Sequence, residues 1–248
     1  MKNEGAIPAR VCARHLSKVY GKTDYQVTAC RDIDFSAEPG SITALLGLNG
    51  AGKSTLLKIL CGIQYASEGS ISVCGETDIA SIRRLCEYVP EVSELDFSLT
   101  VKETLFREAF LRNCPKAEIR AQIHSAAAAL DLEAVLGKTV GTLSKGYRQR
   151  VSLAKALAAN TDVLVLDEFS AGLDPAQIVK VRDLMKELAK QKTIILSTHH
   201  IEEALTLCAE IYILHKGTVV AHGSPEGLLA SAKKQNLEEA FLWFTRAQ

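Results

Sequence analysis

One short segment carries the residue types of a phosphate-binding loop. Residues 47–54 read GLNGAGKS, which matches the spacing GxxxxGK(S/T). Glycines let the backbone curl so that its N–H groups face phosphate oxygens, and a helix that begins directly after the loop adds unpaired donors and a positive dipole end. The segment predicts a site for nucleotide phosphates, and the alternative is a plain glycine turn. The residues expected to contact the phosphates are Asn49, Gly50, Ala51, Gly52, Lys53, Ser54 and Thr55.

Within this loop, two side chains have separate tasks. Lys53 places a positive charge against the β and γ phosphates, and the Ser54 hydroxyl is an expected ligand for Mg²⁺.

Two carboxylates stand at the end of a short apolar run. Residues 163–166, VLVL, are followed directly by Asp167 and Glu168. Ligands of α/β folds bind at the carboxyl ends of parallel strands, so an acidic pair in this place can serve a nucleotide site. Asp167 is the expected Mg²⁺ ligand, and Glu168 can orient and deprotonate an attacking water. Alone, the pair could be two solvated loop acids; the phosphate loop favours the catalytic interpretation.

A third apolar run, TIILS at residues 193–197, ends in a histidine pair. Thr198 precedes His199 and His200, and an imidazole at a strand tip can reach a γ-phosphate. A lone strand-end histidine is more often a surface or capping residue, so this assignment depends on the other two motifs.

The segments around these residues alternate between strands and helices. Residues 41–46, 161–166 and 193–197 are apolar runs of strand length, whereas residues 53–61 place apolar side chains at helical spacing. Asp174 followed by Pro175 is typical of a helix start, and that helix is expected to run to about Lys190. The alternation predicts an α/β fold with a largely parallel sheet.

The middle of the chain has a different texture. Residues 101–111, 116–130 and 146–159 all have helical patterns, and residues 92–159 contain no convincing strand. This pattern predicts a helical subdomain inserted into an α/β core within one domain, 1–248, whose core comprises 1–91 and 160–225. A hairpin is expected at 211–220, and a terminal amphipathic helix at 237–245, within a tail of residues 226–248.

Composition narrows the classes of function. The 248 residues include 29 Lys plus Arg and 29 Asp plus Glu, so no basic excess points to a nucleic-acid partner. No apolar run approaches the roughly 18 residues that cross a bilayer, and residues 1–15 lack the apolar region of a secretory signal. The seven cysteines form no CxxC pair, which favours reduced, mostly buried thiols. These features predict a cytoplasmic protein that reaches a membrane only through a partner.

The segment LSKGYRQR at residues 143–150 decides which family the phosphate loop and the acidic pair resemble. It resembles the signature LSGGQ, extended as LSxGxxQR, of the ABC-transporter nucleotide-binding domain. On this resemblance, residues 47–54 are the Walker A motif and VLVLDE is Walker B. Residues 170–174 are similar to the D-loop, and residues 197–199 to the switch-histidine region, which favours His199 over His200.

The resemblance implies a P-loop NTPase core with a mainly parallel sheet, an antiparallel β N-terminal part and the inserted helical subdomain, with ATP and Mg²⁺ as cofactors. It implies that Tyr20 stacks on adenine, although a core aromatic is the alternative. It also implies that Ser144 and Gly146 contact ATP, and that Glu91 stands where the family has its Q-loop glutamine. The metal ligands implied together are Ser54, Asp167 and Glu91.

The subgroup most resembled serves two-component bacterial exporters of the ABC-2 kind. The resemblance implies an ATPase subunit at the cytoplasmic face of a membrane, bound to a separate transmembrane permease. It also implies a nucleotide-dependent homodimer, or a heterodimer with a related ATPase. Two other readings are a soluble ABC ATPase that acts away from membranes and a degenerate ATP-binding regulator. The degenerate regulator is disfavoured, because the chain has all four residues that ATP hydrolysis needs: Lys53, Asp167, Glu168 and His199.

Four positions depart from the family pattern. Lys145 replaces the first signature glycine, and Tyr147 stands where glutamine is usual. Phe169 replaces the proline that commonly follows the Walker B glutamate, which puts the rigidity of that loop in doubt. Glu91 replaces the Q-loop glutamine.

Overall fold

The computed structural model describes residues 11–21 and 25–246. Residues 1–10, 22–24 and 247–248 lie outside this description. Most of residues 1–15, the segment that lacks the apolar region of a secretory signal, is therefore not described. The last two residues of the expected tail, 226–248, are not described either. Within the described residues the chain forms two sheets, nine α-helices and two 3₁₀ turns.

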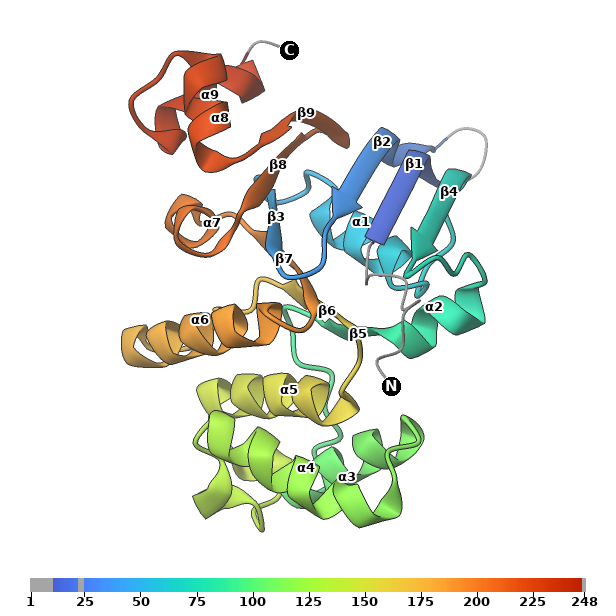
Figure 1. The fold of residues 1–248 in the computed structure, drawn as a ribbon, viewed down its shortest axis with the longest axis vertical. Helices are drawn as coiled ribbons and strands as arrows, with labels where there is room; N and C mark the ends of the chain where they lie inside the picture. The colour runs from blue at the N-terminus through green and yellow to red at the C-terminus, as the bar shows by residue number, and fades with distance from the viewer. Residues whose placement is uncertain (1–10, 22–24, 247–248) are drawn as a thin grey trace, which may run out of the picture.

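A six-stranded sheet lies at the centre of the molecule (Figure 1). Its order is β5-β6-β7-β3-β8-β9; the first five strands are parallel, and β9 pairs with β8 as an antiparallel hairpin. The three central strands are buried along their whole length, which explains their continuous apolar sequences. The strands are β3 (Ile42–Leu46), β5 (Cys86–Val89), β6 (Val163–Asp167), β7 (Thr193–Thr198), β8 (Glu210–His215) and β9 (Thr218–Gly223).

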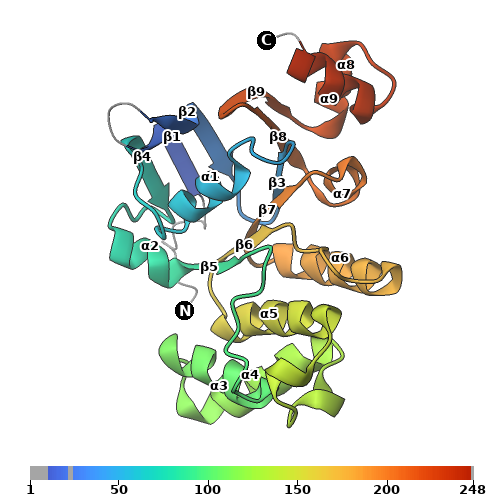
Figure 2. The same cartoon turned by 180° about the vertical axis from the view of Figure 1, so that it is seen from behind.

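A three-stranded antiparallel sheet in the order β2-β1-β4 forms the N-terminal part. Helix α1 (Lys53–Leu60) lies between the two sheets (Figure 2). Its Leu57 shares one buried core with Ile33 of β2 and Leu45 of β3, so the helix after the phosphate loop is held from both sides. The strands are β1 (Val11–Tyr20), β2 (Val27–Ala37) and β4 (Glu68–Val73).

The opposite face of the large sheet packs into a second core. Met185 of α6 (Pro175–Ala189) and Ala204 of α7 (Ile201–Leu207) belong to this core, together with Leu46 and Leu196 from the strands. The helices α8 (Pro225–Ala232) and α9 (Leu237–Arg246) cover the far end beyond β8 and β9 (Figure 1). A short helix, α2 (Ile79–Leu85), leads into β5.

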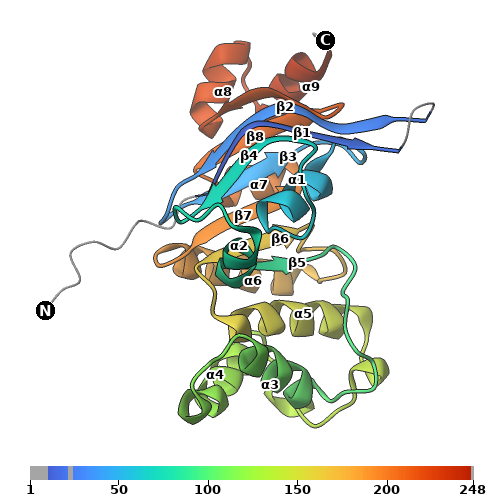
Figure 3. The same cartoon turned by 90° about the vertical axis from the view of Figure 1, so that its right-hand side faces the viewer.

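The helical subdomain stands below β5 and β6, with α5 nearest to the sheet (Figure 3). It comprises α3 (Val101–Leu111), α4 (Lys116–Ala129) and α5 (Lys145–Ala159), with 3₁₀ turns at Glu133–Val135 and Val140–Thr142. Thr100 and Glu103 form a capping box that starts α3. Residues 92–159 are all described and contain no strand, apart from one bridge between Thr100 and Thr139.

The predicted α/β class, with its antiparallel N-terminal part and inserted helices, is confirmed. Some boundaries were wrong by one or two residues. The helix expected from Gly146 begins at Lys145, because the Ser144 side chain caps it by accepting from the backbone N–H of Tyr147. The strand expected at 161–166 spans Val163–Asp167 and therefore includes the first acidic residue.

The seven cysteines all lie in the described part of the chain, and none of them forms a disulfide in the structure. Cys30, Cys61, Cys86 and Cys208 are buried, whereas Cys12, Cys74 and Cys114 are half-buried. Burial raises the pKa of Cys30 to about 12, and burial is likewise the main reason that the pKa of Cys61 lies well above its usual range. The thiols of Cys30 and Cys61 are therefore protonated at neutral pH.

Candidate functional site

The register of the parallel strands brings the three motifs to one edge of the sheet. Leu46, the last residue of β3, pairs with Thr198, the last residue of β7, and Asp167 of β6 pairs with Ser197. The phosphate loop, the acidic pair and the histidines each continue from one of these strand ends. Segments far apart in sequence therefore meet at the carboxyl edge, where α/β folds bind ligands.

The phosphate loop ends at Gly52, which precedes the first helical residue, Lys53. Gly52 has a φ of 106°, and a Cβ there would lie 2.3 Å from the carbonyl oxygen of Ala29. Only glycine fits this close approach. The turn at Gly52 lets the N-terminal end of α1 face the loop, where its free N–H groups can bind phosphate. The Lys53 side chain is 6% exposed, and its Nζ donates to the carbonyl of Gly47 at 2.7 Å. The ammonium group thus lies inside the curve of the loop.

A row of three charged or titratable side chains forms the centre of the site. Lys53 Nζ lies 3.2 Å from Glu168 Oε1, and Glu168 Oε2 lies 2.9 Å from His199 Nδ1. Glu168 is 6% exposed and has a left-handed φ of 47°, with its N–H donating to the carbonyl of Ser197 at 3.2 Å. The sequence motifs predicted these three residues, and the structure brings them into direct contact.

Asp167 is held from both sides. Its Oδ1 accepts from the Ser197 hydroxyl, and its Oδ2 accepts from the Tyr88 hydroxyl at 2.8 Å. Burial, and then the negative charge of Asp167, raise the pKa of Tyr88 above its usual range, so the phenol stays a hydrogen-bond donor. Sequence reasoning missed both partners, because each lies on a different strand from Asp167 and far from it in the sequence.

The turn after β7 explains why the two histidines differ. Thr198 Oγ1 donates to the buried carboxylate of Glu203 at 2.7 Å and accepts from the His200 backbone N–H at 2.9 Å. This bridge fixes the turn, and His199 then faces Glu168. Glu203 is 2% exposed, and its role was not predicted from the sequence.

Tyr20 stands at the end of β1 beside the phosphate-loop helix. Its hydroxyl donates to Gln64 Oε1 at 2.6 Å and lies 3.4 Å from Thr55 Oγ1, while the residue is 38% exposed. The ring is thus partly open to solvent and is not a fully buried core aromatic. Glu91 follows β5 at the same sheet edge and is exposed.

The signature segment forms the start of α5. Ser144 is the N-cap, and a Cβ on Gly146 would lie 2.9 Å from the carbonyl oxygen of Gly172. The methylene groups of Lys145 also lie against Gly172, so this replacement packs on the D-loop. Phe169 is 0% exposed in the core, which shows how the loop is anchored without proline.

The donors near the phosphate loop suit a hard cation. Ser54 offers a hydroxyl and Asp167 a carboxylate, the oxygen ligands that Mg²⁺ prefers. Among the described residues no group of three His, Cys, Asp or Glu side chains could hold a metal by itself. A Mg²⁺ ion in this place would therefore also need oxygen ligands from the nucleotide.

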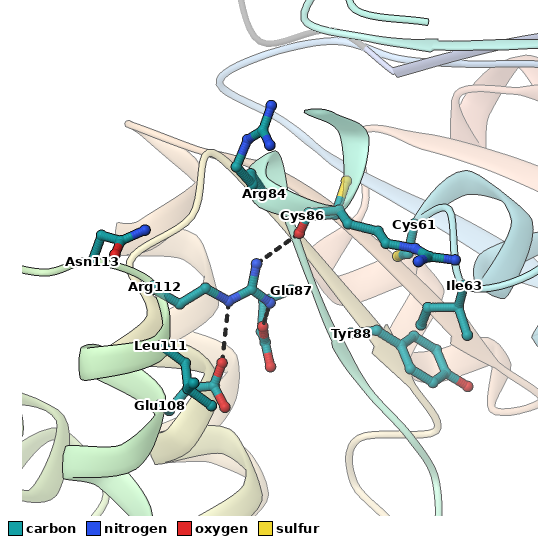
Figure 4. Close-up of a pocket in the computed structure, with 11 residues that line it drawn as sticks. Cys61, Ile63, Arg84, Cys86, Glu87, Tyr88, Glu108, Leu111, Arg112 and Asn113 are labelled. Carbon is teal, nitrogen blue, oxygen red and sulfur yellow. Dashed lines mark hydrogen bonds and ion pairs between the residues drawn. The ribbon is translucent and has the colours of Figure 1, made fainter. Parts of the chain in front are cut away.

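A cavity of about 490 Å³ opens between the core and the helical subdomain. Figure 4 shows Arg112, the residue directly after α3, at its centre, directed at both Glu87 and Glu108. Lys155 of α5 lies 3.5 Å from Glu87, so two cations and two carboxylates join α3, α5 and β5. Burial, followed by the negative charge of Glu108, raises the pKa of Glu87, whereas Arg112 and Lys155 lower it.

Comparison with known proteins identifies the family. The family described as "ABC transporter" matches residues 30–171, more than half of the chain. The chain belongs to the ABC transporter family. The Nod factor export ATP-binding protein I of Burkholderia thailandensis is 41% identical over 207 residues, which cover 80% of this chain and 67% of that protein. The ABC transporter ATP-binding protein NatA of Bacillus subtilis is 31% identical, with 87% and 90% covered.

Solved structures agree with this placement. A structure described as the ATP binding subunit of an ABC transporter superposes with a TM-score of 0.87 at 30% identity, covering 94% of this chain and 98% of that one. The dimeric structure of MJ0796, a bacterial ABC transporter cassette, has the same fold, with a TM-score of 0.79 at 24% identity and coverage of 86% and 98%.

This member of the ABC transporter family is therefore an ATP-binding subunit that hydrolyses ATP. Both named relatives are transporter subunits, so an ABC ATPase that acts away from membranes is not favoured. In the part of the chain that the structure describes, no helix has the length and apolarity required to cross a bilayer.

Proposed function

We propose that this subunit drives an ABC-2-type exporter by hydrolysing ATP between two copies of the domain. The observation that supports the site assignment most directly is the contact of Lys53, Glu168 and His199 at one sheet edge. Export is proposed because two of the relatives are a Nod factor export protein and NatA, and because the signature and histidine segments resemble those of that subgroup.

Each ATP is proposed to lie between the phosphate loop of one copy and Ser144 and Gly146 of the other. The start of α5 supports this arrangement, because its first N–H groups and dipole favour an anion. Tyr20 stacks on adenine beside the phosphate loop. The partner copy is a second molecule of this chain or a related ATPase.

Hydrolysis follows from the order of the side chains. Lys53 binds the β and γ phosphates, and Glu168 accepts a proton from the water whose oxygen attacks the γ-phosphorus. The bond from that phosphorus to the β-phosphate oxygen breaks, and ADP leaves with the electron pair. His199 donates to a γ-phosphate oxygen and thereby stabilises the developing charge. The distances of 3.2 Å from Lys53 to Glu168 and of 2.9 Å from His199 to Glu168 support this assignment.

Mg²⁺ is proposed to be held by Ser54 and Asp167, with Glu91 as a further ligand. The ion would neutralise phosphate charge. A carboxylate at 91 is a stronger ligand for this cation than the family's amide. We therefore expect Glu91→Gln to raise the Mg²⁺ concentration needed for half-maximal ATPase activity and Glu91→Ala to raise it further. An identical Mg²⁺ dependence of all three proteins would remove Glu91 from the metal site.

The permease is proposed to dock at the cavity between the core and the helical subdomain (Figure 4). Residues of β5 and of α3 line this cavity, so a segment seated there contacts both parts of the chain. The subunit then lies at the cytoplasmic face of the membrane through its partner.

One experiment tests the whole proposal. The subunit and its permease are reconstituted in vesicles, and ATPase activity and substrate movement are measured with and without ATP. Stimulation of ATPase activity by the permease, together with ATP-dependent movement, is expected. ATP hydrolysis without any response to the permease would contradict the transport proposal.

A further inference from the structure

The side-chain amide of Gln149 joins two functional segments. Gln149 lies on α5 and is 2% exposed. Its Nε2 donates to the backbone carbonyl of Phe169 at 3.2 Å, and its Oε1 accepts from the Ser93 hydroxyl at 2.8 Å. A carbonyl oxygen can only accept, so the amide must direct its NH₂ group toward Phe169. One end therefore holds the loop that carries Glu168, and the other holds the segment after Glu91.

The loop that carries Glu168 needs such a tie. Glu168 has a left-handed φ of 47°, a conformation that a non-glycine residue keeps only when its surroundings hold it. On the sheet side its N–H donates to Ser197. On the other side the next residue, Phe169, is held by its buried ring and by the bond from Gln149. Glu168 is thus fixed between the sheet and α5.

Because residue 169 is phenylalanine, the bond from Gln149 contributes more to the rigidity of this turn. The family commonly has proline here, whose ring restricts φ and stiffens the turn covalently. Phe169 lacks this restriction, so the turn is stiffened by non-covalent contacts alone. One of those contacts comes from the helical subdomain, through Gln149.

Ser93, at the other end of the amide, belongs to the connection between β5 and α3. It lies two residues after Glu91, beside a cavity of about 360 Å³ whose lining includes Glu91, Gln149 and Ala171 of the D-loop. This cavity leaves room for the connection to move. A displacement of Ser93 would act on the same amide that holds the carbonyl of Phe169.

We propose that Gln149 is a positioning residue that makes the placement of Glu168 depend on the connection between β5 and α3. It acts through Phe169 and does not itself contact the reacting atoms. For the part that concerns the permease, this inference rests on the proposed function, since a docked permease would displace the connection and thereby adjust the catalytic carboxylate. The plain alternative is a buried glutamine that only stabilises the fold.

The first test separates positioning from stability. Gln149→Glu keeps an acceptor for Ser93 and removes the donor to Phe169, while Gln149→Met removes both bonds without burying a charge. We expect both to lower kcat about tenfold to a hundredfold, because catalysis is sensitive to misplacement of about 1 Å. The dissociation constant for ATP should stay within about twofold, because the phosphate loop is untouched.

The matched control is Gln122→Met. Gln122 also lies in the helical subdomain, and its Nε2 donates to the carbonyl of Leu157 at 3.4 Å, away from the Glu168 loop. It should lower the melting temperature as Gln149→Met does and leave kcat unchanged. A folded Gln149→Met protein with wild-type kcat would overturn the proposal. An equal fall of kcat in the control would assign Gln149 a merely structural role.

The second test addresses the link to the permease. Ser93→Ala keeps the bond to Phe169 and removes the other end of the tie. We expect the stimulation of ATPase activity by the reconstituted permease to fall about threefold or more. Full stimulation in Ser93→Ala would refute the link. If the wild type shows no stimulation at all, the proposed transport function fails instead, and the kcat of the Gln149 variants still decides the positioning role.

Discussion

The carboxyl edge of the six-stranded sheet and the start of α5 both carry motif residues, but they are built differently. At the sheet edge, parallel strands in register bring Lys53, Glu168 and His199 into contact within one chain. At α5, a single helix start presents Ser144 and Gly146, which in the proposed dimer meet the ATP of the other copy. The difference indicates that changes at the edge should alter binding and chemistry, whereas changes at the helix start should alter assembly.

The largest expected effect is at the centre of the sheet edge. Glu168→Gln should lower kcat by about 10²–10⁴-fold, because it removes the proposed general base. ATP should still bind, because Lys53 and the phosphate loop remain, and light scattering should then show a dimer that depends on ATP. A monomer mass that is the same with and without ATP would contradict the proposed difference between the two regions. The start of α5 would then not bind the ATP of a second copy.

Lys53→Ala tests the same edge through binding. In the proposed complex the ammonium makes a charge-assisted contact with phosphate worth about 1.5–3 kcal/mol, so its loss should weaken ATP affinity by about tenfold to a hundredfold. Nucleotide titration measures this, and circular dichroism checks the fold. Lys58→Ala is the control, because this second lysine lies one turn further along α1. An equal affinity for ATP in Lys53→Ala and the wild type would contradict the assignment of residues 47–54 as a phosphate-binding loop.

Tyr20 tests whether the antiparallel sheet also contributes to ATP binding, because this residue ends strand β1. Tyr20→Ala should weaken ATP binding by about 1–3 kcal/mol, the range for base stacking on an aromatic ring. Tyr20→Phe loses the bond to Gln64 but keeps the ring, so its affinity should match the wild type. Unfolding of Tyr20→Ala, in place of weaker binding, would favour a core role for the ring.

The smallest effect is expected at the start of α5. Ser144 and Ser224 are both N-cap serines that accept from a backbone N–H three residues later, at 3.4 and 3.1 Å. Replacing either by alanine should lower the free energy of unfolding by about 1 kcal/mol. Only Ser144→Ala should also reduce ATP-dependent dimerisation in the Glu168→Gln background. Equal dimerisation in both variants would mean that the Ser144 hydroxyl serves its own helix alone.

The contrast between these regions also explains what could be predicted from the sequence. The phosphate loop and the acidic pair are contiguous motifs next to strands, so sequence spacing was sufficient to find them. Tyr88 bonds to Asp167, 79 positions away, and Gln149 bonds to Ser93, 56 positions away, and such pairs depend on how strands and helices pack. No local pattern encodes either pair.

Element boundaries show the same limit. The helices α2 and α7 have seven residues each, too few for a clear helical period, and neither was predicted. The start of α5 was placed one residue late, because the capping bond of Ser144 and not the signature glycine decides where the helix begins.

The distribution of thiols has a practical consequence. Buried cysteines react slowly with alkylating reagents, so the half-buried Cys12, Cys74 and Cys114 should be labelled first. Cys12 and Cys74 belong to the antiparallel sheet and its edge, whereas Cys114 stands between α3 and α4 in the helical subdomain. A fluorophore on Cys114, paired with a second on Cys74 in a protein that lacks Cys12, would report the separation of the two subdomains. The distance between these two labels would therefore test whether ATP changes the separation of the subdomains, as the proposed function requires.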